Sequence, residues 1–371
     1  MRVLYVNRPN CLVKIGGDTV QMLKTKEYLE KQFGITITIC DDVNDLACFR
    51  DCDVVHMFNI QGADHTRAAL EQCKRAKKKA ALSTIFWDMG SASYVSMLYK
   101  ALRLKPSPFA AKAEVAGHLL GTLAYGLVRG KSNVMFNKKH VARQILLDVD
   151  YLLPNSHEEL ELLSRVFNLD LAVLTRKATV VPNAVDVERV VGGPDAPTDL
   201  KGYVLQVARI EPVKNQLNVV RALFKFRDIP IVFVGRSGDD RYFLDVKKVA
   251  EKRGNVFFLG EVPNDQVYGF YRRAACHVLP SFRESPGLVS LEALMCNVPI
   301  VVSDSRFCPT QYYQFDKYGY ICDPYSTLSI RAAVLSAIEK GPKAEVGTDY
   351  RYFYSYANVA NKTFEVYRSL V

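Results

Sequence analysis

Short apolar runs rich in β-branched residues alternate with stretches whose apolar residues recur at helical spacing, along almost the whole chain. Five runs in the first half are predicted strands: Arg2–Asn7, Ile35–Cys40, Asp53–Phe58, Ala80–Phe86 and Tyr151–Pro154. Five runs in the second half are predicted strands as well: Tyr203–Ala208, Ile231–Gly235, Val256–Leu259, His277–Pro280 and Ile300–Ser303. Helical patterns such as Thr19–Phe33 and Asp265–Ala275 separate them. Continuous apolar strands that alternate with helices are typical of parallel sheets covered on both faces, so the pattern predicts an α/β fold.

The two sets of strands predict two domains. The polar segment Val191–Lys201, with two Gly and two Pro, lies between them and is the predicted linker. A chain of 371 residues also exceeds what one hydrophobic core usually organises. We therefore expect a Rossmann-like domain over residues 1–185, a second over 186–350, and a cleft between them. An aromatic-rich C-terminal helix is expected over 351–371.

Composition indicates a globular protein and narrows its location. Apolar residues make up 49% and charged residues 24%, which excludes a disordered or collagen-like chain. The longest uncharged apolar run, Val115–Val128, is 14 residues long and too short to span a bilayer. The first residues enter a strand without a basic region or a small-residue cleavage site, so we expect no signal peptide. The nine Cys contain no CxxC pair, which argues against a disulfide scaffold and fits a cytoplasmic protein.

Positive charge is concentrated in one segment. The net charge is +10, yet residues 72–143 hold 14 Lys or Arg against Asp88 and Glu114, an excess of +12. Such a segment is either a solvated face or a surface for nucleic acid, an anionic membrane or a phosphate-bearing substrate. RNP-like motifs, zinc fingers and helix-turn-helix signals are absent, which argues against nucleic acid. Within it, Tyr94–Lys105 has an amphipathic helical pattern, which indicates either core packing or peripheral association with an anionic membrane.

The most specific motif follows the predicted strand His277–Pro280. A loop contains Glu284, a helix opens at Gly287 and Leu288, and that helix contains Glu292. Open α/β sheets bind ligands at the carboxyl ends of their strands. Free amides at a helix start and the positive end of its dipole suit a phosphate. With Glu284 in the loop and Glu292 on the helix, the two carboxylates can contact different parts of one extended ligand.

A second motif follows the predicted strand Tyr203–Ala208. Arg209 and Lys214 flank a short turn, where they can neutralise a diphosphate without a metal. The next strand ends at Gly235, which lets a backbone approach a ligand closely. Pairs of Asp elsewhere lie in polar loops, and we assign no metal and no cofactor to the chain.

The order of these motifs resembles the nucleotide-sugar-binding domain of GT-B glycosyltransferases, specifically retaining glycosyltransferase family 4 (glycosyl transferases group 1). The resemblance is specific over about 180 residues and rests on these positions: Arg209 and Lys214, Gly235, Gly260-Glu-Val262-Pro263, and Glu284 with Glu292. Pro182-Asn183-Ala-Val-Asp186 resembles the segment that precedes the second domain of the family. Residues 355–371 resemble the helix that crosses back to the first domain. The resemblance thus implies a GT-B fold with two parallel sheets facing across a cleft.

The resemblance also implies how a nucleoside diphosphate sugar is bound. Arg209 and Lys214 would hold the diphosphate, Glu292 the ribose hydroxyls, and Glu284 the donor sugar. In mechanistic terms, the two cations stabilise the charge that the leaving diphosphate gains as the glycosidic bond breaks. Because no enzymatic nucleophile is evident, attack by the acceptor on the same face is the route that the resemblance implies.

Backbone positions and the first domain complete the expected site. By resemblance, the amides of Gly287 and Leu288 would meet the phosphate or sugar, and Val262 would lie near the base. Gly16 and Gly17 follow the first strand as the Gly-Gly loop of the family does, facing the donor.

One position departs from the family. The family often carries a His at the end of the fourth strand of the first domain, and this chain has Trp87-Asp88 there. Asp88 is therefore a candidate catalytic residue that would orient the acceptor hydroxyl, or it caps the following segment and the role is absent. His118, in an apolar helical run, is expected in the core or at an interface.

Together these features predict a retaining glycosyltransferase that moves a sugar from a nucleotide diphosphate sugar to an acceptor hydroxyl. The expected acceptor is a glycan or a lipid-linked glycan in cell-surface glycan or glycolipid assembly. The expected location is the cytoplasm, peripheral on the inner face of the membrane. Two alternatives stay open: a nucleotide-sugar 2-epimerase on the same scaffold, and a dinucleotide-dependent oxidoreductase, although the GxGxxG motif is missing.

Overall fold

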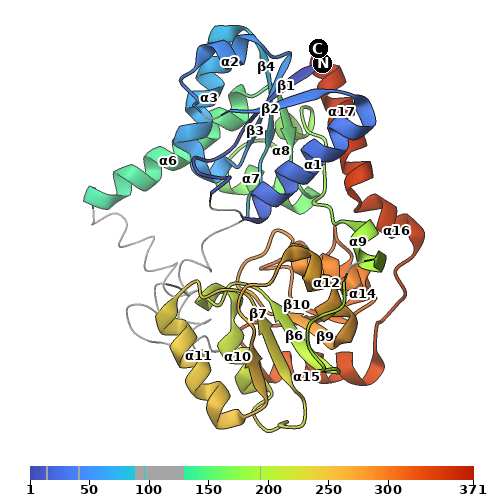
Figure 1. The fold of residues 1–371 in the computed structure, drawn as a ribbon. Coiled ribbons are helices and arrows are strands. Elements are labelled where there is room, and N and C mark those ends of the chain that lie inside the picture. The colour runs from blue at the N-terminus through green and yellow to red at the C-terminus, as the bar shows by residue number, and fades with distance from the viewer. Residues whose placement is uncertain (14–15, 41, 88–95, 97–128, 193) are drawn as a thin grey trace. The chain divides into compact units, whose positions relative to one another are not determined.

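The computed structural model describes the chain except for residues 14–15, 41, 88–95, 97–128 and 193 (Figure 1). It divides into two compact units. The first takes in residues 1–87, the described part of 123–184, and 352–371. The second is built on residues 185–351. In the described part of the chain, no helix is both long and apolar enough to cross a membrane.

The first unit contains a parallel sheet with strand order β2-β1-β3-β4-β5. Its strands are β1 (Arg2–Val6), β2 (Thr36–Ile39), β3 (Val54–Phe58), β4 (Lys79–Ser83) and β5 (Tyr151–Leu153). Its helices are α1 (Gly17–Phe33), α2 (Leu46–Arg50), α3 (Ala63–Ala76), α6 (Arg129–Asp148), α7 (His157–Phe167), α8 (Leu171–Thr175) and α17 (Tyr356–Leu370), with a 3-10 turn η1 (Ile60–Gly62). All five strands expected from the sequence are present.

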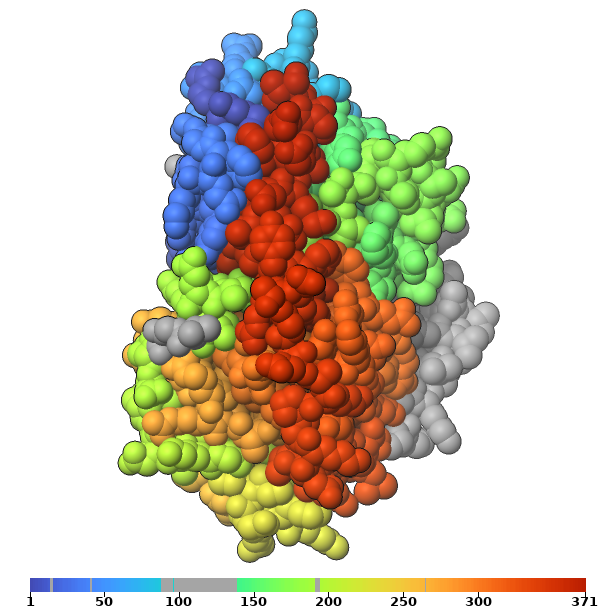
Figure 2. Space-filling view, turned by 90° about the vertical axis from the view of Figure 1, so that its right-hand side faces the viewer, coloured from blue at the N-terminus to red at the C-terminus, as the bar shows by residue number. Residues whose placement is uncertain are grey.

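The C-terminal helix α17 packs against α1, as the sequence predicted, and so completes the first unit. Figure 2 shows it in red on the surface, beside the blue residues of α1. Phe364 of α17 stacks on Phe33 with ring centroids 3.9 Å apart. The hydroxyl of Tyr367, three residues further along the helix, lies 2.6 Å from the buried Nδ1 of His56 in β3. Aromatic side chains therefore anchor the end of the chain to its beginning.

The second unit contains a parallel sheet with strand order β11-β10-β9-β6-β7-β8. Its strands are β6 (Tyr203–Val207), β7 (Ile231–Val234), β8 (Val256–Phe258), β9 (Ala274–Leu279), β10 (Ile300–Ser303) and β11 (Tyr320–Cys322). Its helices are α9 (Val187–Gly192), α10 (Gln216–Ala222), α11 (Asp240–Arg253), α12 (Asn264–Arg273), α13 (Leu288–Met295), α14 (Phe315–Tyr318) and α15 (Thr327–Lys340), with a 3-10 turn η2 (Pro212–Lys214); α16 (Thr348–Phe353) leads into α17. The α/β prediction is confirmed for both units, and β11 is the strand that the sequence did not reveal.

The predicted linker is wrong in its position. Within Val191–Lys201, Ala196 is buried, and the arginines of α12 hold the surrounding backbone. Arg272 donates to the carbonyl of Pro194 at 2.8 Å, and Arg273 donates to that of Thr198 at 2.7 Å. The segment is therefore part of the second unit, and the chain passes from one unit to the other at residues 184–185. The polar composition, rich in Gly and Pro, correctly indicated a segment mostly without regular secondary structure. Such a segment can still pack within a domain, as this one does against α12.

Candidate active site

The candidate site lies where the direction of strand succession reverses in the second sheet. From β6 the chain proceeds to β7 and β8 on one side, whereas β9, β10 and β11 lie on the other. Because all six strands are parallel, the loops that follow β6 and β9 emerge side by side at the same edge. Crevices at such switch points are where open α/β sheets bind ligands. Both motifs singled out in the sequence are in these two loops.

Lys214 and Glu284 form the centre of this arrangement. Lys214 Nζ lies 2.6 Å from Glu284 Oε1, and both side chains are largely buried. The backbone brings the two loops together, because the Phe282 amide donates to the carbonyl of Val213 at 2.9 Å. The side chain of Gln206 in β6 donates to the carbonyl of Lys214 at 2.6 Å and so holds the turn that follows β6. The structure therefore joins the second motif to the first through one ion pair.

Asn215 locks this junction and was not identified from the sequence. It has a left-handed backbone with φ of 62° and is fully buried. Its side-chain nitrogen Nδ2 donates to the carbonyl of Pro280, after β9, at 2.9 Å and to that of Pro324, after β11, at 2.8 Å. Asn tolerates this backbone region better than most residues, which is the only local signal that it gave. Its contacts span 65 and 109 residues of sequence, so pattern analysis could not find them.

Arg209 occupies the same turn but does not join the central ion pair. Its side chain is 57% exposed, and Nη2 lies 3.1 Å from Glu211 Oε1. The turn pairs with the one after β7, since the Ile210 amide donates to the carbonyl of Arg236 at 2.9 Å. Gly235 makes this approach possible. Its φ is 141°, and a Cβ atom there would lie 2.1 Å from the carbonyl oxygen of Ala208.

The second carboxylate has a different environment from the first. Helix α13 starts at Leu288 after Gly287, whose φ of 85° suits Gly. A Cβ atom at Gly287 would lie 3.3 Å from Glu284 Cγ, so the helix start and Glu284 are neighbours. One turn further on, Glu292 Oε2 accepts a hydrogen bond of 3.1 Å from the hydroxyl of Tyr271. Burial raises the pKa of Glu292 to about 7, although the Tyr271 hydrogen bond opposes the shift.

The loop after β8 contains the remaining donor-side position. Val262 is partly buried in this loop, directly before α12. The carbonyl of Gly260 accepts a hydrogen bond of 2.7 Å from the Gly235 amide, which ties the loop to the end of β7. Val262 thus lies at the same edge of the sheet as the other candidates.

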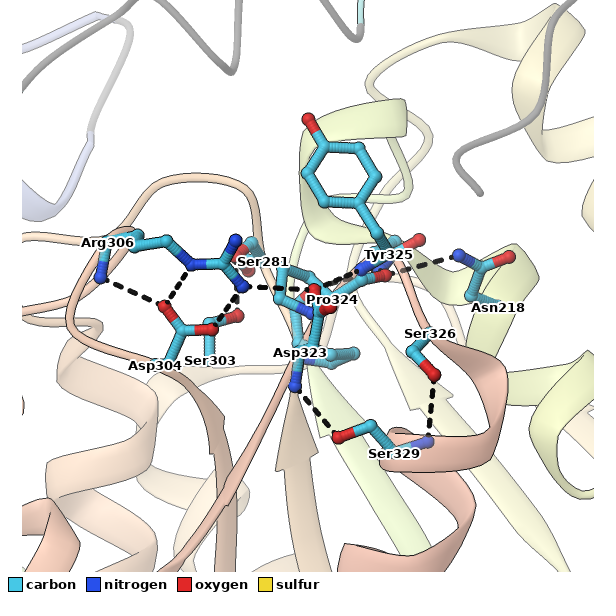
Figure 3. A network of polar contacts seen from close by, with 12 residues as sticks. Asn218, Ser281, Ser303, Asp304, Arg306, Asp323, Pro324, Tyr325, Ser326 and Ser329 are labelled. Carbon is cyan, nitrogen blue, oxygen red and sulfur yellow. Dashed lines mark hydrogen bonds and ion pairs between the residues drawn. The ribbon is translucent and has the colours of Figure 1, made fainter. Parts of the chain in front are cut away.

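A polar network connects the loops that follow β10 and β11 (Figure 3). Arg306 makes two hydrogen bonds to Asp304, of 2.8 and 2.7 Å, and an ion pair of 3.2 Å to Asp323. These carboxylates raise the pKa of Arg306. Ser303 donates to the carbonyl of Ser281 at 2.6 Å, which connects the network to the loop that holds Glu284. Sequence analysis missed this network because its members are far apart in the chain.

The candidates in the first unit are only partly described. Gly16 and Gly17 lie after β1 at the start of α1, again at a switch point, because β1 lies between β2 and β3. Gly16 caps α1 without a side-chain hydrogen bond, and Arg8 pairs with Asp18 beside it at 2.9 Å. Asp88 and His118 lie outside the described residues. Among the residues that are described, no three His, Cys, Asp or Glu side chains gather as a metal site would need.

Several solved structures share the fold of this chain. Anabaena HepE, solved in complex with UDP and glucose, matches with a TM-score of 0.70 and 13% identity, covering 100% of both chains. Sucrose-phosphate synthase from Thermosynechococcus elongatus matches with a TM-score of 0.69 and 14% identity, covering 100% of this chain and 99% of that one. The likeness shows the fold: two parallel α/β units with a returning C-terminal helix, the GT-B class.

Sequence comparison finds relatives of the second unit. Residues 196–352 match the family model Glycosyl transferases group 1. The O-antigen chain mannosyltransferase B of Escherichia coli is 27% identical over 180 residues, 46% of each chain. The D-inositol 3-phosphate glycosyltransferase of Mycolicibacterium smegmatis is 30% identical over 172 residues, 43% of this chain and 39% of that one. The chain spans less than half the length of these two relatives.

Proposed function

We propose that this protein is a retaining glycosyltransferase that transfers a sugar from a nucleoside diphosphate sugar to an acceptor hydroxyl. The observation that carries the proposal is the Lys214–Glu284 ion pair at the switch point of the second sheet. It lies inside the segment that matches the family model Glycosyl transferases group 1. A paired cation and carboxylate at a ligand-binding edge can separate to receive a diphosphate and a sugar.

Each donor-side residue then has a chemical role. Lys214 and the exposed Arg209 neutralise the diphosphate, and the amides of Gly287 and Leu288 bind phosphate or sugar oxygens. Glu292 accepts hydrogen bonds from the ribose hydroxyls, and Glu284 binds the sugar once Lys214 turns to the phosphates. We expect Val262 to contact the base, and we keep Gly16 and Gly17 as candidate donor-binding residues of the first unit.

The transfer moves the sugar from the diphosphate to the acceptor by breaking one bond and forming another. The bond between the anomeric carbon and the β-phosphate oxygen breaks, and its electron pair stays on the diphosphate. The acceptor oxygen forms the new bond on the same face of the sugar, and its proton passes to the departing phosphate oxygen. Lys214 and Arg209 stabilise the charge that develops on the diphosphate, which lowers the barrier without an added nucleophile.

The acceptor and location extend the proposal. An O-antigen mannosyltransferase and D-inositol 3-phosphate glycosyltransferases among the relatives support an acceptor in glycan or glycolipid assembly. We expect the protein to work in the cytoplasm at the inner face of the membrane. UDP-sugars are the first donors to test because a structural neighbour was solved with UDP and glucose.

The test combines a binding panel with a product assay. Thermal shift with UDP, GDP, ADP and CMP sugars identifies the donor, because a true donor stabilises the folded chain by mass action. Free nucleoside diphosphate is then measured with and without candidate acceptors. Acceptor-dependent release supports a transferase. Isomerised sugar nucleotide without an acceptor would instead identify an epimerase, and no turnover with tight binding would identify a binding protein.

A further inference from the structure

A buried tyrosine contacts the carboxylate that the proposed function assigns to the ribose. Tyr271, near the end of α12, is fully buried, and its hydroxyl donates to Glu292 Oε2 at 3.1 Å. The two residues come from consecutive helices, 21 positions apart. A buried tyrosine hydroxyl needs an acceptor, and any backbone carbonyl could supply one. Here the acceptor is an ionisable side chain at the candidate site.

The ring of Tyr271 is held in one orientation by its neighbours. His277 of β9 packs edge-on against it with ring centroids 5.6 Å apart, and Tyr268 packs edge-on from the preceding turn at 6.3 Å. His277 is fully buried, and burial lowers its pKa to about 3, so its ring is neutral at ordinary pH. Neither of its ring nitrogens has a hydrogen-bond partner in the described part of the chain. His277 therefore contributes ring packing, and no hydrogen bond in the described part of the chain, to the position of Tyr271.

A fixed hydroxyl can hold a carboxylate in one rotamer. The terminal torsion of a Glu side chain is broad, so a free carboxylate samples many orientations. Binding a vicinal diol requires two oxygens in a defined plane, and ordering them at the moment of binding costs affinity. Tyr271 engages Oε2 before any ligand arrives.

We propose that Tyr271 is a positioning residue that preorients Glu292 for the ribose hydroxyls of the donor nucleotide. This inference rests on the proposed function, because it takes the ribose as the ligand of Glu292. No sequence motif marks this contact, in which α12 and β9 supply the aromatic residues and α13 supplies the carboxylate. Tyr271 itself touches neither the sugar nor the diphosphate.

The test compares nucleotides with and without ribose hydroxyls. Binding of UDP and GDP is measured by calorimetry beside their 2′,3′-dideoxy forms, for the wild type and Tyr271→Phe. We expect the wild type to prefer the ribose form of the nucleotide that it binds. Tyr271→Phe should weaken binding of that form by about tenfold, the effect of losing roughly one hydrogen bond to a charged group. Its affinity for the dideoxy form should change less than twofold.

Tyr203→Phe is the matched control. The Tyr203 hydroxyl is also buried in the second unit, but it donates to the backbone carbonyl of Phe270 at 2.8 Å. Its removal costs a similar hydrogen bond without touching Glu292, so the ratio of ribose to dideoxy affinity should stay at the wild-type value. Tyr271→His, whose ring N–H can still donate, is a second variant in which we expect an intermediate ratio.

The outcomes separate this inference from the proposed function. Equal weakening of both nucleotide forms by Tyr271→Phe, or a wild-type ratio in that variant, overturns the positioning role. If Tyr271→Phe does not fold, Tyr271→Leu, which also lacks the hydroxyl donor, replaces it, and a wild-type ratio in that variant overturns the role. Glu292→Ala tests the proposed function separately: an unchanged ratio there means that Glu292 does not bind ribose. A changed ratio in Glu292→Ala with an unchanged ratio in the tyrosine variants removes only the inference about Tyr271.

Discussion

At the scale of single residues, Lys214 and Glu284 have to be considered as one unit. Each neutralises the other in the structure, with 2.6 Å between Lys214 Nζ and Glu284 Oε1. Sequence analysis assigned them separate roles, one for the diphosphate and one for the sugar. The ion pair adds that removing either partner leaves an uncompensated charge at a largely buried position.

This coupling predicts opposite effects on nucleotide binding. Lys214→Ala should weaken binding of a free nucleoside diphosphate about 10–100-fold, since a charge-assisted hydrogen bond contributes roughly 1.5–3 kcal/mol. Glu284→Ala should bind it as tightly as the wild type or more tightly, because Lys214 is released, while sugar transfer is lost. Calorimetry and a turnover assay measure the two quantities. Equal weakening of nucleotide binding in both variants would contradict the assigned roles.

Glu292 predicts a pH dependence at the same scale. Burial raises its pKa to about 7, and hydroxyl groups donate best to the ionised form. The preference for a ribose nucleotide over its 2′,3′-dideoxy form should therefore increase as pH rises from 5.5 to 8. Using the ratio cancels the titration of the phosphates, which both forms share. In Glu292→Gln the ratio should not vary with pH, and a pH-independent ratio in the wild type would refute the prediction.

The site residues differ in how visible they were in the sequence. Glu284, Glu292 and Lys214 stand within short motifs next to strand ends, so local order identified them. Asn215 and Tyr271 act through contacts with residues distant in sequence or on other elements. Only tertiary packing shows such partners, and a lone buried Asn or Tyr looks like any core residue in a sequence.

At the scale of elements, one buried carboxylate joins two strand ends in the first unit. Glu159 of α7 is fully buried and accepts hydrogen bonds from Thr84 Oγ1, from the Phe86 amide at 2.6 Å and from the Asn155 amide at 2.7 Å. Burial raises its pKa to about 7 against the effect of these three donors. Between two of its partners, Ile85 has φ of 45°, an unusual backbone for a β-branched residue. Glu159 therefore stabilises the unusual backbone of the segment that follows β4.

Glu159→Gln should destabilise the first unit by about 1–3 kcal/mol. The amide nitrogen of Gln would face a donor and leave a buried polar group unsatisfied. Urea unfolding followed by far-UV circular dichroism measures the change. Glu161→Gln, on the exposed side of the same helix, is the control and should stay within about 0.5 kcal/mol of the wild type. A wild-type unfolding midpoint for Glu159→Gln would show that the carboxylate does not hold the strand ends.

At the scale of the whole molecule, the alternation of strands and helices predicted both sheets because buried parallel strands are continuous apolar runs. Two features escaped prediction for physical reasons. Strand β11 is a run of three residues between Gly319 and Asp323 with only one β-branched member, which is a weak strand signal. The segment 191–201 contains the residues of a linker, yet α12 binds its backbone through Arg272 and Arg273. Composition indicates where regular structure stops, but it does not show what packs there.

The positive segment 72–143 belongs to this scale, because its charge is spread over many residues of the sequence. Lys74, Arg75, Lys77 and Lys79 at the end of α3 and the start of β4 are exposed, although Lys74 and Lys79 pair with Asp148 and Asp150 at 2.7 Å. The amphipathic pattern Tyr94–Lys105 lies outside the described residues, apart from Ser96. If the proposed acceptor is anchored in a lipid bilayer, this positive charge would hold the protein beside it, with each nearby Lys or Arg adding about 1 kcal/mol.

We therefore predict that the protein binds anionic liposomes and that salt releases it. Sedimentation with vesicles of phosphatidylglycerol and phosphatidylcholine, at about 50 and 500 mM salt, measures the binding, since high salt screens surface charge. Changing Lys100, Arg103 and Lys105 to Glu should abolish binding. The matched control changes Lys247, Lys248 and Lys252 of α11, in the second unit, to Glu and should bind as the wild type does. Equal loss in both variants would mean that net charge alone drives the interaction. Absence of wild-type binding to anionic vesicles at low salt would favour an acceptor that is free in solution.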